Sequence, residues 1–219
     1  MENTLQRDVK SVCKLVDDRA AQEGRVIIGI AGPPASGKST LAEAVVQRLN
    51  DQHTGPVAQA VLLPMDGFHL DNRILEARGL LARKGAPQTF DAAGFCDAVQ
   101  LLAKAERESF HPTFDRTLDL AVAGAISIGS ETPVVVIEGN YLLLNSEPWS
   151  RLREVFTATV FISPPVEVLK RRLHQRWIDH GLDSDAALRR ATQNDLPNAE
   201  LVISHSRDAD LHLHQDQAN

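Results

Sequence analysis

A glycine-rich loop with the sequence GPPASGKST spans residues 32–40 and follows the apolar run VIIGIA at 26–31. It fits the pattern G-x-x-x-x-G-K-[ST], in which successive backbone N–H groups surround phosphate oxygens. Lys38 would bring its charge to the outer phosphates, and the Ser39 hydroxyl is placed to ligate Mg²⁺. A helix beginning near Lys38 would add its positive N-terminal end. We therefore predict ATP or GTP binding by the whole loop: Gly32, Pro33, Pro34, Ala35, Ser36, Gly37, Lys38, Ser39 and Thr40.

Two acidic residues each follow an apolar run: Asp66 after VLLPM and Glu138 after VVVI. In parallel sheets, ligands bind beyond the carboxyl ends of the strands, where both residues would lie. Glu138 is the natural partner of Ser39 in holding Mg²⁺, and the alternative is a cap of the turn that follows it. Asp66 could accept the proton of an alcohol that attacks the γ-phosphate, and the alternative is a helix cap or turn residue. Two carboxylates with separate tasks favour transfer to an alcohol over hydrolysis.

A run of basic residues, KRRLHQRW, occupies positions 170–177. Arg172 and Arg176 are four residues apart and would point the same way from a helix, so both could grip one triphosphate. The planar guanidinium suits phosphate oxygens and can offset charge that develops during transfer. The alternative is the solvated face of a surface helix.

Four further residues are candidates for binding the acceptor, each with a structural alternative. His69 could bond the acceptor or lie in a turn. Asp91 could bond acceptor hydroxyls or cap the helix that follows it. Arg116 could neutralise an anionic acceptor or pair with Asp119 on the surface. Tyr141 could lie beside the acceptor or in the core.

The elements that position these residues alternate between strands and helices, which predicts a parallel α/β sheet with right-handed crossovers. An N-terminal helix within 1–22 is indicated by helical spacing of apolar residues. The other expected helices lie at 38–50, 71–82, 91–107, 166–179 and 184–193. Strands are expected at 26–31, 57–65, 134–137, 157–162 and 210–214.

Composition narrows the class of protein. A chain of 219 residues fits a single domain over 1–219, with a small helical lid at about 166–195. A formal net charge of −6 without a basic block argues against a nucleic-acid partner. Cys13 and Cys96 lie too far apart to indicate a zinc site or a disulfide framework. No apolar run reaches ~18 residues, so we expect no membrane insertion and a cytoplasmic location; the sequence does not indicate the oligomeric state.

With these motifs in place, the chain resembles a known group of P-loop kinases: the uridine kinases, pantothenate kinases and phosphoribulokinases. The resemblance rests on the phosphate loop, on MDGFH at 65–69 and on EGNY at 138–141, and it runs from about residue 24 to 214. The stretches RKGAPQTFD at 83–91 and HPTFDR at 111–116 are similar to bacterial kinases associated with fructose transport systems.

The resemblance implies a P-loop NTPase fold and an ATP- and Mg²⁺-dependent kinase with a small-molecule alcohol as acceptor. It implies that Asp66 is the catalytic base, that Asp91 lies at the acceptor pocket and that lid arginines close on the phosphates. Gln175 stands where a family arginine is expected. A sugar is the first choice of acceptor, with a nucleoside or pantothenate next. The competing class is an NTPase without a small acceptor, which would need Lys38, Ser39 and Glu138 but not Asp66.

Overall fold

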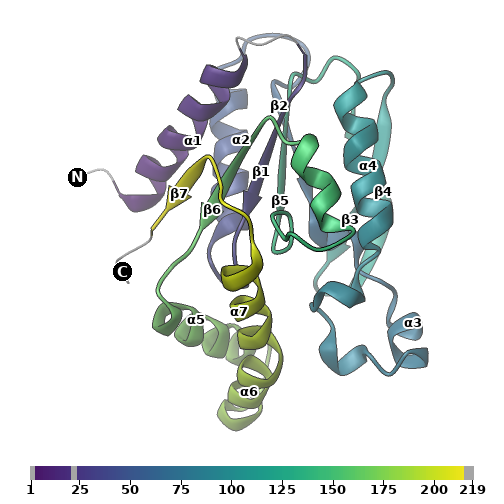
Figure 1. Ribbon diagram of the computed structural model, residues 1–219, viewed down its shortest axis with the longest axis vertical. Helices are drawn as coiled ribbons and strands as arrows, with labels where there is room; N and C mark the ends of the chain where they lie inside the picture. The colour runs from purple at the N-terminus through teal and green to yellow at the C-terminus, as the bar shows by residue number, and fades with distance from the viewer. Residues whose placement is uncertain (1–2, 21–23, 215–219) are drawn as a thin grey trace.

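Five parallel strands form the central sheet in the order β2-β5-β1-β6-β7 (Figure 1). The computed structural model describes residues 3–20 and 24–214. Continuous apolar runs make β1, β5 and β6 buried along their whole length, as expected for strands with both faces covered. The strand bounds are β1 Val26–Ala31, β2 Ala60–Pro64, β5 Val134–Gly139, β6 Ala158–Ile162 and β7 Leu211–Leu213.

Helices cover both faces of this sheet. Helices α1 (Thr4–Ala20) and α2 (Lys38–Asp51) pack on one face, where Ile28 and Ile30 of β1 point. Helices α4 (Ala92–Lys104) and α7 (Leu196–His205) pack on the other face, with Ile27. The predicted parallel α/β fold of the P-loop class is therefore confirmed.

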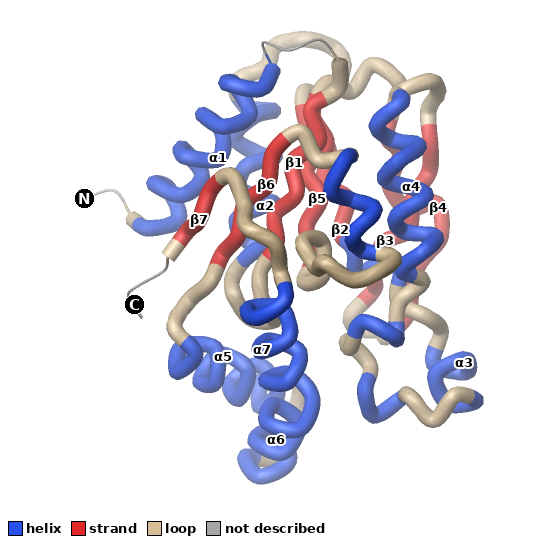
Figure 2. The backbone as a smooth tube through the Cα atoms, in the orientation of Figure 1, coloured by secondary structure: helices blue, strands red, loops and turns tan. Residues whose placement is uncertain are grey.

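Two groups of elements lie beyond the carboxyl ends of the strands (Figure 2). One group contains α5 (Val166–Asp179), α6 (Ser184–Arg190) and the π-helical turn Ala191–Asp195, which leads directly into α7. The other contains the 3-10 turn Met65–Phe68, the short helix α3 (Asn72–Ala77) and two further 3-10 turns, Leu81–Arg83 and Pro87–Thr89. An antiparallel hairpin, β3 (Ser109–Asp115) with β4 (Leu120–Ile128), flanks this second group.

Several predicted elements are shorter than expected. The helix expected at 71–82 covers 72–77 only and gives way to Gly79, whose φ of +66° is the left-handed conformation that ends helices. The helix expected at 91–107 ends at Lys104, before Ala105 in the same conformation. Strand β2 begins at Ala60, three residues later than expected. The outer residues of the N-terminal helix expected at 1–22, positions 1–2 and 21–22, lie outside the described residues.

Strands β3 and β4 of the hairpin and helix α7 had no counterpart among the predictions. Most of β4 is exposed on both faces, so it lacks the alternation that marks a half-buried strand. Helix α7 carries Pro197 in its first turn, where proline is tolerated, although a proline in a sequence usually suggests a break. Across residues 3–20 and 24–214, no helix is both long and apolar enough to cross a bilayer.

Candidate active site

The phosphate loop connects β1 to α2, and its backbone requires small residues. Gly37 has φ +91° and Ala35 has φ +62°, both in the left-handed region. A Cβ on Gly32 would lie 2.5 Å from the Ile162 carbonyl oxygen, so only glycine allows this close approach to β6. Lys38 is the first residue of α2, at the positive end of the helix.

Ser39 and Glu138 meet as the sequence predicts. The Ser39 hydroxyl donates to Glu138 Oε2 at 3.2 Å, because Glu138 ends β5, the strand beside β1. Glu138 is 4% exposed, and this burial raises its pKa against the opposing effect of the Lys38 charge. Burial likewise lowers the pKa of Lys38, and the Glu138 charge opposes that shift. Burial thus disfavours the charged form of both side chains, and the charge of a bound ligand would change this balance.

This hydroxyl–carboxylate pair fits Mg²⁺, which prefers hard oxygen ligands and retains several waters. Two protein oxygens are enough when substrate phosphates complete the shell. Over the described part of the chain, no group of three or more His, Cys, Asp or Glu side chains is arranged to hold a metal by itself. Ser39 and Glu138 are therefore candidates for holding a metal whose remaining ligands come from a nucleotide and water.

Asp66 lies in the 3-10 turn that follows β2 and faces the same cavity. Its Oδ2 accepts from Arg116 Nη2 at 2.8 Å, across the β3–β4 hairpin, and its side chain is 24% exposed. Arg116 thus pairs with Asp66 rather than with Asp119. The cavity has a volume of about 700 Å³, and most of the predicted catalytic and binding side chains line it: Lys38, Ser39, Asp66, His69, Arg116, Arg172 and Arg176.

Both predicted arginines of α5 reach this cavity. Arg172 Nη1 donates to the carbonyl oxygens of Ala35 and Ser36, at 3.3 and 3.4 Å, so its guanidinium lies against the phosphate loop. Burial lowers the pKa of Arg176, and the nearby Arg116 charge lowers it further. Gln175 is exposed and donates to Asp179, away from the cavity.

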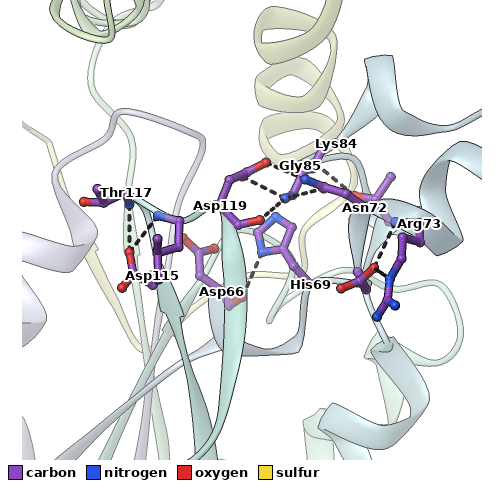
Figure 3. A network of polar contacts seen from close by, with 12 residues as sticks. Asp66, His69, Asn72, Arg73, Lys84, Gly85, Asp115, Thr117 and Asp119 are labelled. Carbon is purple, nitrogen blue, oxygen red and sulfur yellow. Dashed lines mark hydrogen bonds and ion pairs between the residues drawn. The ribbon is translucent and has the colours of Figure 1, made fainter.

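His69 lines the same cavity, and three neighbouring groups contact its ring. Its ring centroid lies 4.0 Å from that of Phe90 and 4.8 Å from that of Phe114. Its Nδ1 lies 2.8 Å from the backbone oxygen of Asp66. Burial lowers its pKa, although the Asp66 charge opposes the shift. Figure 3 shows the ring between Asp66 and the pair formed by Lys84 and Asp119.

Lys84 and Asp119 form an ion-paired junction that the sequence did not assign, in which the Asp119 side chain is 54% exposed. Lys84 Nζ lies 2.7 Å from Asp119 Oδ1, 2.9 Å from the Asp119 carbonyl oxygen and 2.7 Å from Asn72 Oδ1 (Figure 3). The Lys84 side chain is only 11% exposed. The junction ties α3 and the turn at 81–83 to the tip of the β3–β4 hairpin. Lys84 lies in the stretch 83–91, which is similar to bacterial kinases associated with fructose transport systems, but nothing in the sequence links Lys84 to Asp119.

Two predicted acceptor residues do not line this cavity. Asp91 is exposed and caps α4, with Oδ1 accepting from the Gly94 N–H at 3.0 Å. Tyr141 is fully buried among aromatic rings, and its hydroxyl donates to the Gly85 carbonyl oxygen at 2.5 Å. Each thus occupies the position of its structural alternative, although Tyr141 supports the backbone beside Lys84.

A second group of contacts, which the sequence does not predict, joins the helical segment after α5 to the backbone at 82–84. Arg190 donates to the Ala82 carbonyl oxygen at 2.6 Å, and Asn194 donates to the Lys84 carbonyl oxygen at 2.9 Å. In the opposite direction, the Arg83 guanidinium donates to the Gln193 carbonyl oxygen at 2.6 Å. Arg190 and Asn194 belong to no recognised motif, so the sequence alone does not predict these contacts.

Comparison with known proteins gives the family that the chain matches and several of its relatives. The family model described as "Phosphoribulokinase / Uridine kinase family" matches residues 27–215. "Uncharacterized protein YggC" of Escherichia coli is 35% identical over 187 residues, covering 85% of this chain and 76% of that protein. The "Putative uridine kinase C227.14" of Schizosaccharomyces pombe is 32% identical over 198 residues, covering 87% and 83%.

A solved structure shows the same arrangement. The crystal structure of a "putative fructose transport system kinase" from Silicibacter sp. TM1040 superposes with a TM-score of 0.84 at 43% sequence identity. The match covers 93% of this chain and 98% of that one. The similarity therefore extends over nearly the whole of both chains.

Proposed function

The chain belongs to the phosphoribulokinase/uridine kinase family, and from this premise we propose that it transfers the γ-phosphoryl group of ATP to a hydroxyl of a small sugar. The observation that carries the proposal is the position of Asp66. Its carboxylate lines the same cavity as Lys38 and Ser39 but comes from a different strand end. The cavity thus has room for a phosphoryl donor and for an alcohol beside a base.

The nucleotide is held by the phosphate loop and α2. Backbone N–H groups of 32–40 and the Lys38 ammonium surround the phosphates, and Arg172 lies against the same loop. Ser39 and Glu138 would hold Mg²⁺, which would neutralise the negative charge of the phosphates during transfer. The triphosphate would also relieve the burial of Lys38 by adding negative charge beside it.

Asp66 acts on the acceptor. A carboxylate within hydrogen-bond reach of the attacking hydroxyl orients it and takes its proton as the new P–O bond forms. Arg116 holds the carboxylate at 2.8 Å and so fixes its direction. Arg176, in the same cavity, can offset the charge on the phosphoryl oxygens during transfer.

A sugar is preferred over other alcohols for two reasons. The relative of known structure with 43% identity is named for a fructose transport system. The side chains around Asp66 are mainly hydrogen-bonding groups. A nucleoside is the second candidate, because the Schizosaccharomyces pombe relative is named as a uridine kinase and Phe90 and Phe114 line the cavity.

The test is coupled ADP release over a panel of hexoses, pentoses, polyols, uridine, cytidine and pantothenate at equal concentration, with Asp66→Asn as the blank. We expect sugars to stimulate ADP release most. Turnover of a pyrimidine nucleoside without turnover of any sugar would overturn the acceptor but leave the kinase standing. ADP release that no alcohol stimulates would favour an NTPase.

A further inference from the structure

The two halves of the cavity differ in how their charges are balanced. We call the side formed by Asp66, His69, Lys84, Arg116 and Asp119 the acceptor half. There, Lys84 lies 2.7 Å from the carboxylate of Asp119, and Arg116 lies 2.8 Å from that of Asp66. Each cation on this side is therefore matched by its own carboxylate.

The other side, which we call the nucleotide half, is formed by Lys38, Ser39, Arg172, Arg176 and Arg190. Among the described residues of this half, the three cations Lys38, Arg176 and Arg190 line the cavity beside two carboxylates, those of Glu138 and Asp195. An excess of positive charge suits a triphosphate. The matched charges of the acceptor half offer no such attraction to a second anion, because each cation there already faces a carboxylate.

His69 presents one specific hydrogen-bonding group to the acceptor half. The Asp66 carbonyl oxygen, 2.8 Å from Nδ1, can only accept, so Nδ1 carries the ring hydrogen. Burial between two aromatic rings lowers the pKa of His69 and keeps the ring neutral near pH 7. Nε2, at the far side of the ring, is then a hydrogen-bond acceptor that none of the described side chains occupies.

Asn140 offers a second acceptor. It follows Glu138 by two residues, and its side chain lines the cavity. Its Oδ1 is buried, and no donor among residues 3–20 and 24–214 reaches it. A buried carbonyl oxygen without a partner is rare in native proteins and indicates a site that a ligand or water completes.

We propose that the acceptor half selects an uncharged polyhydroxy compound, whose hydroxyls donate to His69 Nε2 and Asn140 Oδ1, and excludes phosphorylated or carboxylated acceptors. This inference rests on the proposed kinase function for the assignment of the two halves. It narrows the substrate class to neutral sugars and polyols. His69 and the Lys84–Asp119 pair are then the residues that set specificity, whereas Asp66 performs the chemistry.

The charge balance can be tested without turnover. With a non-hydrolysable ATP analogue and Mg²⁺ saturating the nucleotide half, inorganic phosphate is titrated into the protein by calorimetry. We expect no saturable binding by the wild type. Asp119→Asn uncovers Lys84 and should bind phosphate at least about tenfold more tightly than the limit set by the wild-type titration, a difference of ~1.4 kcal/mol. Asp208→Asn, the same change on an exposed residue near β7, is the control and should behave like the wild type.

Phosphate binding by the wild-type complex, or no gain in Asp119→Asn, would overturn the exclusion of anions. Failure to bind the ATP analogue at all would instead count against the proposed function. The two failures are therefore distinguishable.

The role of His69 is tested by nitrogen NMR of the histidine rings, with the His69 signals assigned by their loss in His69→Gln. We expect the neutral ring with hydrogen on Nδ1, and a shift of the Nε2 signal when a neutral acceptor binds. An Nε2–H ring at neutral pH would overturn the assignment. In turnover, each neutral sugar should exceed its own phosphate ester in kcat/KM by at least about tenfold, and the reverse order would also overturn the proposal.

Discussion

The nucleotide half and the acceptor half face one cavity but are built by different means. The nucleotide half depends on strand ends fixed by backbone pairing, since β1 lies between β5 and β6 with both ladders intact. The acceptor half depends on side chains: Lys84 to Asp119 and Arg116 to Asp66, each joining segments far apart in the chain. Because the nucleotide half is built on backbone pairing, it would bind phosphates in the same way for any acceptor. Side-chain pairs allow the acceptor to change without disturbing the sheet.

The sharpest test of this division is Asp66→Asn. We expect kcat to fall by about 10²–10⁴ with the affinity for Mg-ATP unchanged, because a base acts mainly in the transition state. Steady-state kinetics and calorimetry measure the two quantities. Asp51→Asn, the same change at an exposed position at the end of α2, is the matched control.

Glu138→Gln gives the contrasting result in the nucleotide half. It should lower the rate and also raise the Mg²⁺ concentration needed for half-maximal activity, because Glu138 bonds the Ser39 hydroxyl at 3.2 Å. Identical metal dependence in the two variants would show that the halves do not divide the work as we propose.

A smaller effect is expected for Lys38→Ala. Loss of this cation from the phosphates should weaken Mg-ATP binding by at least about tenfold, or ~1.4 kcal/mol, as measured by calorimetry. The variant should remain folded, because burial already lowers the pKa of Lys38 and its charge is costly in the empty site. Lys170→Ala, an exposed residue of α5, controls for the charge change. Unchanged affinity in the folded variant would remove the basis for the nucleotide half.

Lys84→Met tests whether side chains hold the acceptor half. Asp119 and Asn72 would lose their shared donor, and because the Asp119 side chain is 54% exposed and can bind water instead, the cost should be that of an ordinary hydrogen bond, about 1 kcal/mol. Amide hydrogen exchange should quicken at 72–84 and 116–120 and stay unchanged in β1 and β5. Lys104→Met, at an exposed position, should leave both unaffected. Faster exchange throughout the sheet would contradict the separation of the two halves.

The smallest effect concerns pH. Because burial lowers the pKa of His69, the unfolded chain binds more protons than the folded chain below about pH 6.5, the ordinary value for histidine. The free energy of unfolding should therefore fall as the pH drops through this range, and His69→Gln should reduce that fall. His111, whose pKa is also lowered by burial, contributes in the same direction and remains in the variant.

Chemical denaturation at pH 7 and at pH 5.5 measures the difference. His53→Gln, an exposed histidine, should follow the wild type. Parallel losses of stability in the wild type and His69→Gln would show that His69 does not remain neutral in the folded protein.

The same contrast explains which features could be predicted from the sequence. The loop at 32–40 is contiguous, and Asp66 and Glu138 directly follow apolar runs, so strand ends alone predict that they converge. The partners of Lys84 and Arg190 are set by how turns and a hairpin fold against one another. No spacing rule encodes such contacts, so Asp119, Asn194 and the backbone of 82–84 could not be assigned. Asp91 is the opposite case. Its position directly before an expected helix predicts a cap as one of two alternatives, and the structure confirms the cap.

The hydrogen bonds from Arg190 and Asn194 to the backbone at 82–84 have one further consequence. They join the segment that carries Arg176 and Arg190 to the segment that carries Lys84, so the two substrates meet parts of one connected body. If an acceptor shifts this body and thereby changes the affinity for ATP, thermodynamic reciprocity requires ATP to change the affinity for that acceptor by the same factor. The response to one substrate would then depend on the concentration of the other.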